Sequence, residues 1–114
     1  MKHIYTYFLW IDDVRPAPIS NYHQVWSSSY HHAIHTINHM IDNGHSIIIS
    51  FDHDLGFGKS GYDVAKYIVE NQLPQDRISW RVHSANPVGV ANITQLLTHY
   101  GYPRAKEEGL WFEG

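Results

Sequence analysis

Three short clusters of polar side chains in this sequence have residue types that bind metal ions or move protons. Each cluster directly follows an apolar run that is typical of a β-strand. The clusters are Asp12-Asp13, Asp52-His53-Asp54 and His83-Ser84-Ala85-Asn86. If the three runs are parallel neighbours in one sheet, the clusters meet at its carboxyl edge, where open α/β sheets bind ligands. The sequence therefore predicts a site as well as a fold.

The carboxylates in these clusters indicate a divalent cation. Asp12, Asp13 and Asp52 would repel one another at a shared edge unless a cation or protons intervened. A shell of carboxylate oxygens favours Mg²⁺ or Mn²⁺ with several retained waters. Asp54 would be a further ligand or lie just outside the shell, since residues two apart project alike along a strand. The alternative is that one acid, above all Asp13, only caps a helix or lies in a loop.

The two histidines of the clusters have two possible roles. As nitrogen ligands, His53 and His83 would shift the preference toward Mn²⁺, Zn²⁺ or Fe²⁺. As acid–base groups they would exchange protons near neutral pH without touching a metal. We favour the second role for His83, because its strand end faces the expected phosphate. For His53, a buried structural role with a hydrogen bond to the backbone is a further alternative.

Four other side chains are candidates for holding a phosphate. Ser84 and Asn86, together with the N–H groups of a helix that begins there, would cradle phosphate oxygens. Plain helix capping is the alternative for Asn86. Lys59 on a glycine-flanked loop and Arg15 on the opposite side would close over an anionic ligand, unless they are solvated surface charges.

The composition describes one globular domain over residues 1–114. Apolar residues make up 43% and charged residues 17% of the chain, which is enough for one core. The chain has no cysteine, which excludes disulfides and cysteine-bound zinc and fits a cytoplasmic protein. We find no signal-peptide pattern and no apolar stretch of membrane length. The net charge of −3 argues against a duplex DNA surface, and the oligomeric state stays open.

Apolar periodicity predicts four strands that alternate with helices. The expected strands are 4–11, 23–27, 46–51 and 78–83, and the expected helices are 30–43, 61–72 and one that begins after Asn86-Pro87. Prolines after Val14 forbid a helix directly behind the first strand. The alternation predicts a small parallel sheet that is covered on both faces by right-handed crossovers. Residues 110–112 either add a short strand or pack on the core.

Histidines also recur at helical spacing in the first expected helix. His31, His35 and His39 share one face, and histidines four residues apart can share a metal ion. We favour a solvated polar face, because no carboxylate or cysteine completes a shell there.

These residues give the chain a resemblance to the receiver domains of response regulators. Asp12-Asp13 resembles their acidic pair, Asp52 their phospho-accepting aspartate, and Ser84-Ala85 their hydroxyl residue with its alanine. Gly61-Tyr62-Asp63-Val64 is similar to their glycine-led third helix. The chain differs in three ways: it has no convincing counterpart of the receiver lysine, it has prolines in place of the first helix, and it has His53-Asp54-Leu55-Gly56 after the aspartate.

The chain resembles more closely a divergent branch, the cyclic-phosphate-processing receiver-like domains. The matching segments bracket residues 9–100. They are Leu9-Trp10-Ile11-Asp12-Asp13-Val14-Arg15-Pro16, Ser50-Phe51-Asp52-His53-Asp54-Leu55-Gly56, Gly61-Tyr62-Asp63-Val64 and His83-Ser84-Ala85-Asn86-Pro87-Val88-Gly89. The resemblance implies a small phage or bacterial protein with a doubly wound, flavodoxin-like α/β/α fold of three layers. Its first helix would be reduced and its last strand degenerate.

The leading hypothesis is a metal-dependent phosphoesterase that opens a cyclic phosphate on a nucleotide or an RNA end. Asp12, Asp13, Asp52 and Asp54 would hold Mg²⁺ or Mn²⁺, and His53 or His83 would transfer protons. A covalent phosphate on Asp52 is a variant. The alternatives are a non-catalytic binder of a cyclic or phosphorylated nucleotide, and a receiver module controlled by phosphorylation. Four tryptophans either supply a base-stacking platform or belong to the core; they are Trp10, Trp26, Trp80 and Trp111.

Overall fold

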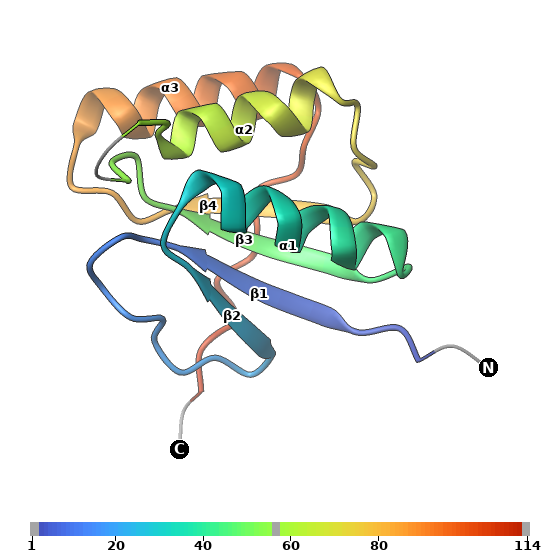
Figure 1. The fold of residues 1–114 in the computed structure, drawn as a ribbon. Helices are drawn as coiled ribbons and strands as arrows, with labels where there is room; N and C mark the ends of the chain where they lie inside the picture. The colour runs from blue at the N-terminus through green and yellow to red at the C-terminus, as the bar shows by residue number, and fades with distance from the viewer. Residues whose placement is uncertain (1–2, 56–57, 113–114) are drawn as a thin grey trace.

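The computed structural model describes residues 3–55 and 58–112, where a parallel sheet lies beneath three helices (Figure 1). The elements in chain order are β1 (Thr6–Ile11), β2 (His23–Ser27), α1 (Tyr30–Asp42), β3 (Ser46–Phe51), α2 (Gly61–Glu70), β4 (Ile78–Val82) and α3 (Pro87–His99). The sheet order is β2-β1-β3-β4, and every neighbouring pair is parallel. The predicted receiver-like α/β fold is confirmed, with element ends close to those expected.

The two faces of the sheet follow from the period-2 alternation of its strands. In β1, Leu9 and Ile11 pack into the main core, whereas Phe8 and Trp10 belong to a separate cluster on the other face. Helices α1, α2 and α3 all contribute buried residues to the main core. All three helices therefore cover the same face, which we call the helix face; the opposite side is the loop face.

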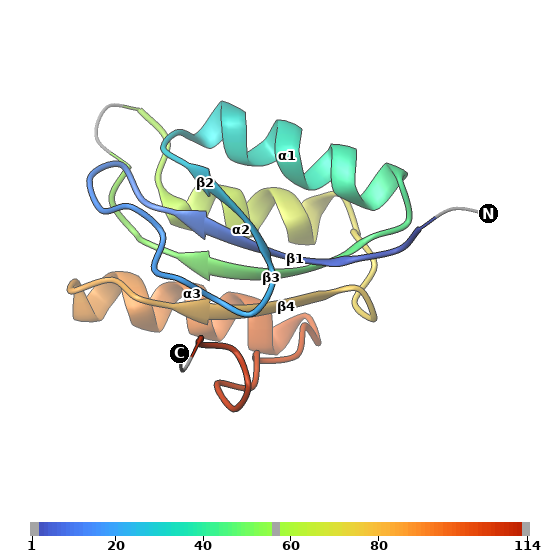
Figure 2. The same ribbon diagram turned by 90° about the horizontal axis from the view of Figure 1, so that it is seen from below.

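The loop face differs from the predicted third layer of helices. Within the described residues it is covered by the connection 12–22 and by the C-terminal segment, both irregular (Figure 2). Ala17, Leu110 and Trp111 pack there on the aromatic side chains of β1. The connection cannot form an ordinary crossover helix because Pro16 and Pro18 interrupt it. The third layer of this fold is thus made of loops.

The C-terminal segment makes isolated bridges in place of a fifth strand. Arg104 forms a parallel bridge with Trp80 of β4, and Trp111 forms an antiparallel bridge with Ser20. The expected degenerate last strand is therefore reduced to single bridges. Of the two alternatives for residues 110–112, the structure shows packing: Leu110 is buried and Trp111 packs beside it, while Trp111 makes one isolated bridge and no strand.

Side-chain caps fix the start of each helix near the sheet edge. Ser29 accepts from the N–H of His32 in α1, and Ser60 forms a capping box with Asp63 in α2. Asn86 caps α3, with Pro87 at the first helical position. The histidines of the stripe on α1 are exposed, as expected of a solvated face. In the described part of the chain, no helix has the length and apolar character needed to cross a bilayer.

Candidate metal and phosphate site

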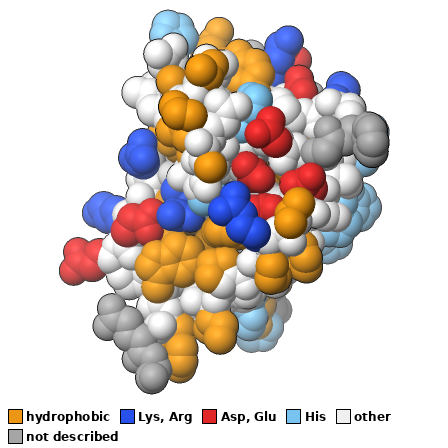
Figure 3. Space-filling view, turned by 90° about the vertical axis from the view of Figure 1, so that its left-hand side faces the viewer, with side chains coloured by type: hydrophobic (Ala, Val, Ile, Leu, Met, Phe, Trp, Pro, Cys, Tyr) orange, Lys and Arg blue, Asp and Glu red, His pale blue; other side chains and the backbone are white. Residues whose placement is uncertain are grey.

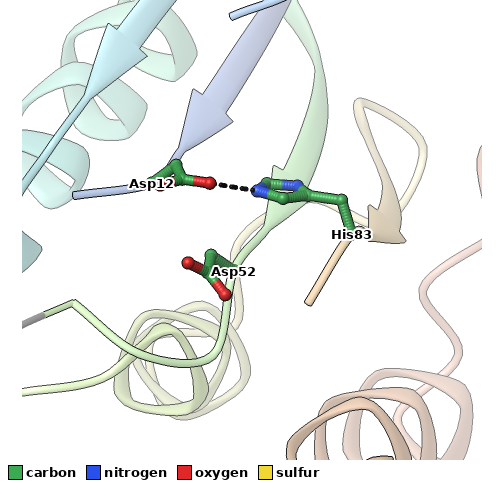
Figure 4. A group of neighbouring side chains, drawn as sticks. All are labelled: Asp12, Asp52 and His83. Atoms are coloured by element: carbon green, nitrogen blue, oxygen red, sulfur yellow. Dashed lines mark hydrogen bonds and ion pairs between the residues drawn. The ribbon is translucent and has the colours of Figure 1, made fainter. Parts of the chain in front are cut away.

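Asp12, Asp52 and His83 meet at the carboxyl edge of the sheet (Figure 4). They follow β1, β3 and β4 directly, and each offers a ligand atom within 4.8 Å of the others. Both carboxylates are buried, with Asp12 fully enclosed. Three of the predicted site residues therefore lie close enough to share one small ion.

The turn after β1 wraps around the Asp12 carboxylate. Its Oδ1 accepts hydrogen bonds from the N–H groups of Val14 (2.9 Å) and Arg15 (2.8 Å). Its Oδ2 lies 3.1 Å from His83 Nε2 and 3.3 Å from Arg15 Nε. Burial raises the pKa of Asp12, but these donors outweigh burial, so its net pKa lies below the ordinary value. Asp12 is therefore ionised at neutral pH.

The pKa of Asp52 is shifted in the opposite direction, above its ordinary value. Burial and the negative charge of Asp12 raise its pKa, against the weaker effects of the His53 and Asp54 N–H groups and the Ser84 hydroxyl. The first residue of α2 packs directly against the backbone of Asp52, because a Cβ at residue 61 would overlap the Asp52 carbonyl oxygen. Glycine at this position lets α2 begin directly against the strand end. The negative charge of Asp12 makes ionisation of Asp52 costly, and a divalent cation bound to both carboxylates would offset that cost.

His83 lies flat on Trp10, with ring centroids 3.6 Å apart and planes within 6°. Its Nδ1 is 2.7 Å from Ser50 Oγ, and its Nε2 faces Asp12. Burial lowers the pKa of His83 to about 4, although Asp12 acts in the opposite direction. The ring is therefore neutral at pH 7. Because an ionised carboxylate only accepts, the proton of the neutral ring belongs on Nε2.

Of the cluster Asp52-His53-Asp54, only Asp52 belongs to the group of three that meets at the sheet edge. The carboxylate of Asp54 is 72% exposed and lies 3.0 Å from His53 Nδ1. The His53 ring packs on α3, since a Cβ at Gly89 would overlap it. Asp13 is half-buried beside Asp12 and lies outside the group of three. Their expected roles as ligands or proton carriers stay predictions.

The four phosphate candidates lie in different settings. Arg15 contacts Asp12 directly through an ion pair. Lys59 lies over the ring of Tyr30, 4.6 Å from its centroid. Asn86 Oδ1 accepts from the N–H groups of Val88 and Gly89, so its expected capping role is confirmed. Ser84 Oγ accepts from the Asn86 N–H and lies beside Asp52.

Three residues on the loop face behind the site were not predicted to support it. Trp10, Ser50 and Arg81 are register neighbours across β1, β3 and β4. Each stands two residues before a member of the site, and period-2 alternation puts it on the same face. That spacing was available in the sequence. The contact between Arg81 and Glu107 at 2.6 Å, across 26 residues, was not.

The surface around the site is mixed in charge. Figure 3 looks onto the carboxyl edge and shows acidic side chains at its centre, with basic side chains beside them and hydrophobic ones around the border. Trp26 lies at this edge, 44% exposed, and its Nε1–H donates to the Asp12 carbonyl oxygen at 2.6 Å. An aromatic ring therefore adjoins the acidic group.

Comparison with known proteins gives a match to a family model. No curated protein and no solved structure matches the chain significantly. A family model described as the cyclic-phosphate processing receiver domain matches residues 7–99, most of the chain and all of its strands and helices apart from the first residue of β1. The chain belongs to the family of cyclic-phosphate processing receiver domains.

Proposed function

We propose that this domain is a metal-dependent phosphoesterase that hydrolyses a cyclic phosphate on a nucleotide or an RNA end. The observation that carries the proposal is the meeting of Asp12, Asp52 and His83 within 4.8 Å at the carboxyl edge. The family's association with cyclic phosphates supports the substrate class. Hydrolysis would add one water: a new P–O bond forms, one ester P–O bond breaks, and the leaving oxygen takes a proton.

Asp12 and Asp52 would hold Mg²⁺ or Mn²⁺, with Asp13 close by. Bound there, the ion would neutralise phosphate charge and lower the pKa of a water. In the structure, the positive charge nearest to Asp12 Oδ2 in this turn is the guanidinium of Arg15, whose Nε lies 3.3 Å away. Its side chain is 56% exposed and can turn toward a phosphate oxygen. Arg15 would therefore exchange a carboxylate partner for the substrate.

His83 and His53 would divide the hydrogen-bonding and proton-transfer work. A neutral imidazole with its proton on Nε2 is a hydrogen-bond donor, so His83 would orient Asp12 or a phosphate oxygen. His53, held by Asp54 through Nδ1, would exchange a proton with water or with the leaving oxygen. Ser84, beside Asp52, would donate to a non-bridging oxygen.

A nucleotide substrate is favoured by Trp26. Of the four tryptophans, Trp10 and Trp80 are buried and Trp111 is half-buried, whereas Trp26 is exposed at the site edge. Stacking of a base on an aromatic ring contributes about 1–3 kcal/mol. Trp26→Ala should therefore weaken binding of a 2′,3′-cyclic nucleotide about 5-fold or more, but leave binding of a base-free ribose cyclic phosphate unchanged. Tyr100→Ala, an exposed aromatic at the far end of α3, is the matched control.

The function is tested by a hydrolysis screen with Mg²⁺ or Mn²⁺. The substrates are 2′,3′-cyclic and 3′,5′-cyclic nucleotides, cyclic dinucleotides and oligonucleotides with a cyclic-phosphate end. Turnover that disappears in Asp52→Asn and survives in Asp76→Asn, an exposed acid outside the site, supports the proposal. Tight binding without turnover of any of them would instead identify a nucleotide-binding module.

A further inference from the structure

A chain of hydrogen bonds reaches His83 from the C-terminal segment across the loop face. Glu107 Oε1 accepts from Arg81 Nε at 2.6 Å, and Glu107 Oε2 accepts from Trp111 Nε1 at 2.9 Å. Arg81 also lies over the Trp111 ring, 5.0 Å from its centroid. Arg81 Nη1 then donates to Ser50 Oγ at 2.7 Å, and Ser50 Oγ lies 2.7 Å from His83 Nδ1.

The hydrogens along this chain have one consistent arrangement. Arginine only donates, so Ser50 Oγ accepts from Arg81. The single hydroxyl hydrogen of Ser50 is then available to His83 Nδ1, which accepts it with its lone pair. His83 therefore carries its proton on Nε2 and donates it to Asp12 at 3.1 Å.

The other arrangements leave groups without partners. With the proton on Nδ1, a nitrogen lone pair would face the Asp12 carboxylate at 3.1 Å with no hydrogen between them. With protons on both nitrogens of His83, its Nδ1–H and Arg81 Nη1–H would both point at the oxygen of the fully buried Ser50. The hydroxyl hydrogen of Ser50 would then have no acceptor. Unpaired buried polar groups are costly, so the surroundings favour one tautomer.

We infer that Ser50, Arg81 and Glu107 are positioning residues that act together with the Asp12 carboxylate to fix the Nε2–H tautomer of His83, and thereby keep its nitrogen lone pair away from the cation site. His83 then offers the site an N–H donor, and a cation there binds to carboxylate oxygens. Glu107 and Trp111 lie outside the residues that the family model matches, so the outer end of this chain of hydrogen bonds lies in the C-terminal segment. The inference rests on the proposed function only for what the N–H donor contacts during hydrolysis.

The inference is tested by the ¹⁵N signature of the His83 ring in the cation-free protein at pH 7.5. Long-range ¹⁵N–¹H correlation distinguishes the two tautomers, and His83→Gln identifies the His83 signals. We expect Nε2 protonated and Nδ1 unprotonated in the wild type, and a mixture of tautomers in Ser50→Ala. A wild-type ring with its proton on Nδ1, or a Ser50→Ala ring unchanged from the wild type, would overturn the inference.

Two further variants test the inference without changing Ser50, in case Ser50→Ala does not fold. Glu107→Gln changes a side chain that is 54% exposed and should shift the His83 signals toward the mixture, since Arg81 loses its charged partner. Glu108→Gln is the matched control, because it removes the same charge from the adjacent exposed residue and should leave the signals unchanged. Equal effects of the two variants would contradict the relay.

Cation selectivity gives a second measure. Release of the tautomer in Ser50→Ala should expose the Nε2 lone pair and strengthen Zn²⁺ binding about tenfold, while Mg²⁺ binding stays within about twofold because magnesium prefers oxygen ligands. Weaker Zn²⁺ binding in Ser50→Ala would mean that the hydroxyl supports a metal-binding ring, contrary to the inference. Neither measurement needs a substrate, so a protein without hydrolytic activity leaves this inference intact, and an active protein can still refute it.

Discussion

Where β1 and β3 run side by side, Leu9 and Ile49 lie on the helix face, while their neighbours Trp10 and Ser50 lie on the loop face. The first pair is fully buried among helix side chains. The second pair lies in a row that continues to Arg81 and supports His83. A one-residue step along the strand thus separates hydrophobic packing from the hydrogen bonds of the site.

This difference assigns stability and chemistry to opposite faces of the sheet. Apolar burial on the helix face supplies the larger share of folding free energy. The loop face has the smaller apolar cluster and holds the buried polar groups of the site, which cost stability unless they are paired. Substitutions on the two faces should therefore have distinguishable effects.

The largest expected effect on stability is on the helix face. Leu9→Ala removes a fully buried side chain from the main core and should lower the free energy of unfolding by about 2–5 kcal/mol. Denaturant unfolding measures the change. Val14→Ala, which alters an exposed residue beside the site, is the control and should have little effect. A loss below about 1 kcal/mol in Leu9→Ala would mean that this face is not the main source of stability.

On the loop face, His83 should make the protein sensitive to mild acid. Its folded pKa of about 4 lies below the ordinary histidine value of 6.5, so the unfolded chain binds more protons between these values. The contribution of His83 to the free energy of unfolding is fully present above pH 6.5. It is lost as the pH decreases toward 4, by about 2 kcal/mol at pH 5. His83→Gln should remove this part of the pH dependence. Urea unfolding of both proteins at pH 7.5 and pH 5 tests it; equal losses in the two would argue against a buried neutral ring.

Asp52→Asn should separate stability from cation binding. Burial and the charge of Asp12 raise the pKa of Asp52, so its ionised form destabilises the folded state above that pKa. Without a cation at pH 7.5, the variant should therefore melt at a higher temperature than the wild type, and the gain should shrink at low pH. With Mg²⁺ the order should reverse, because the variant binds the ion at least about tenfold more weakly. Melting curves with and without Mg²⁺ test both parts, and a variant that is less stable without the ion would refute the assignment.

The smallest effect is expected at Lys59, which lies on neither face of the sheet. Its ammonium group lies over the ring of Tyr30 at the start of α1, and contacts of this kind at the surface are weak. Lys59→Ala should shift the melting temperature by about 2 °C or less and leave Mg²⁺ affinity unchanged. Loss of substrate affinity in this variant would show that Lys59 moves from Tyr30 to the ligand.

Local patterns in the sequence were enough to predict the helix face and the carboxyl edge. Strand periodicity, the capping box at Ser60 and the cap at Asn86 predicted the elements, and parallel pairing brought Asp12 and Asp52 together. The cover of the loop face depends on contacts distant in sequence, such as Arg81 with Glu107 and Asn21 with residues 109 and 111. No periodicity specifies such contacts. The alternation of strands and helices predicts helices on both faces of the sheet, and the sequence pattern does not show that loops cover one of them.

The bridge between Ser20 and Trp111 has a consequence for the order in which the parts of the molecule can form. A ribosome releases the N-terminal part of the chain first, so the four strands can pair before residues 107–111 have emerged. Until then Phe8 and Trp10 lack their cover of Leu110 and Trp111. Arg81, which donates to Ser50 beside His83, lacks its partner Glu107. The nascent domain would hold its helices in place while the carboxyl edge of its sheet stays unfinished, and the candidate site would form last.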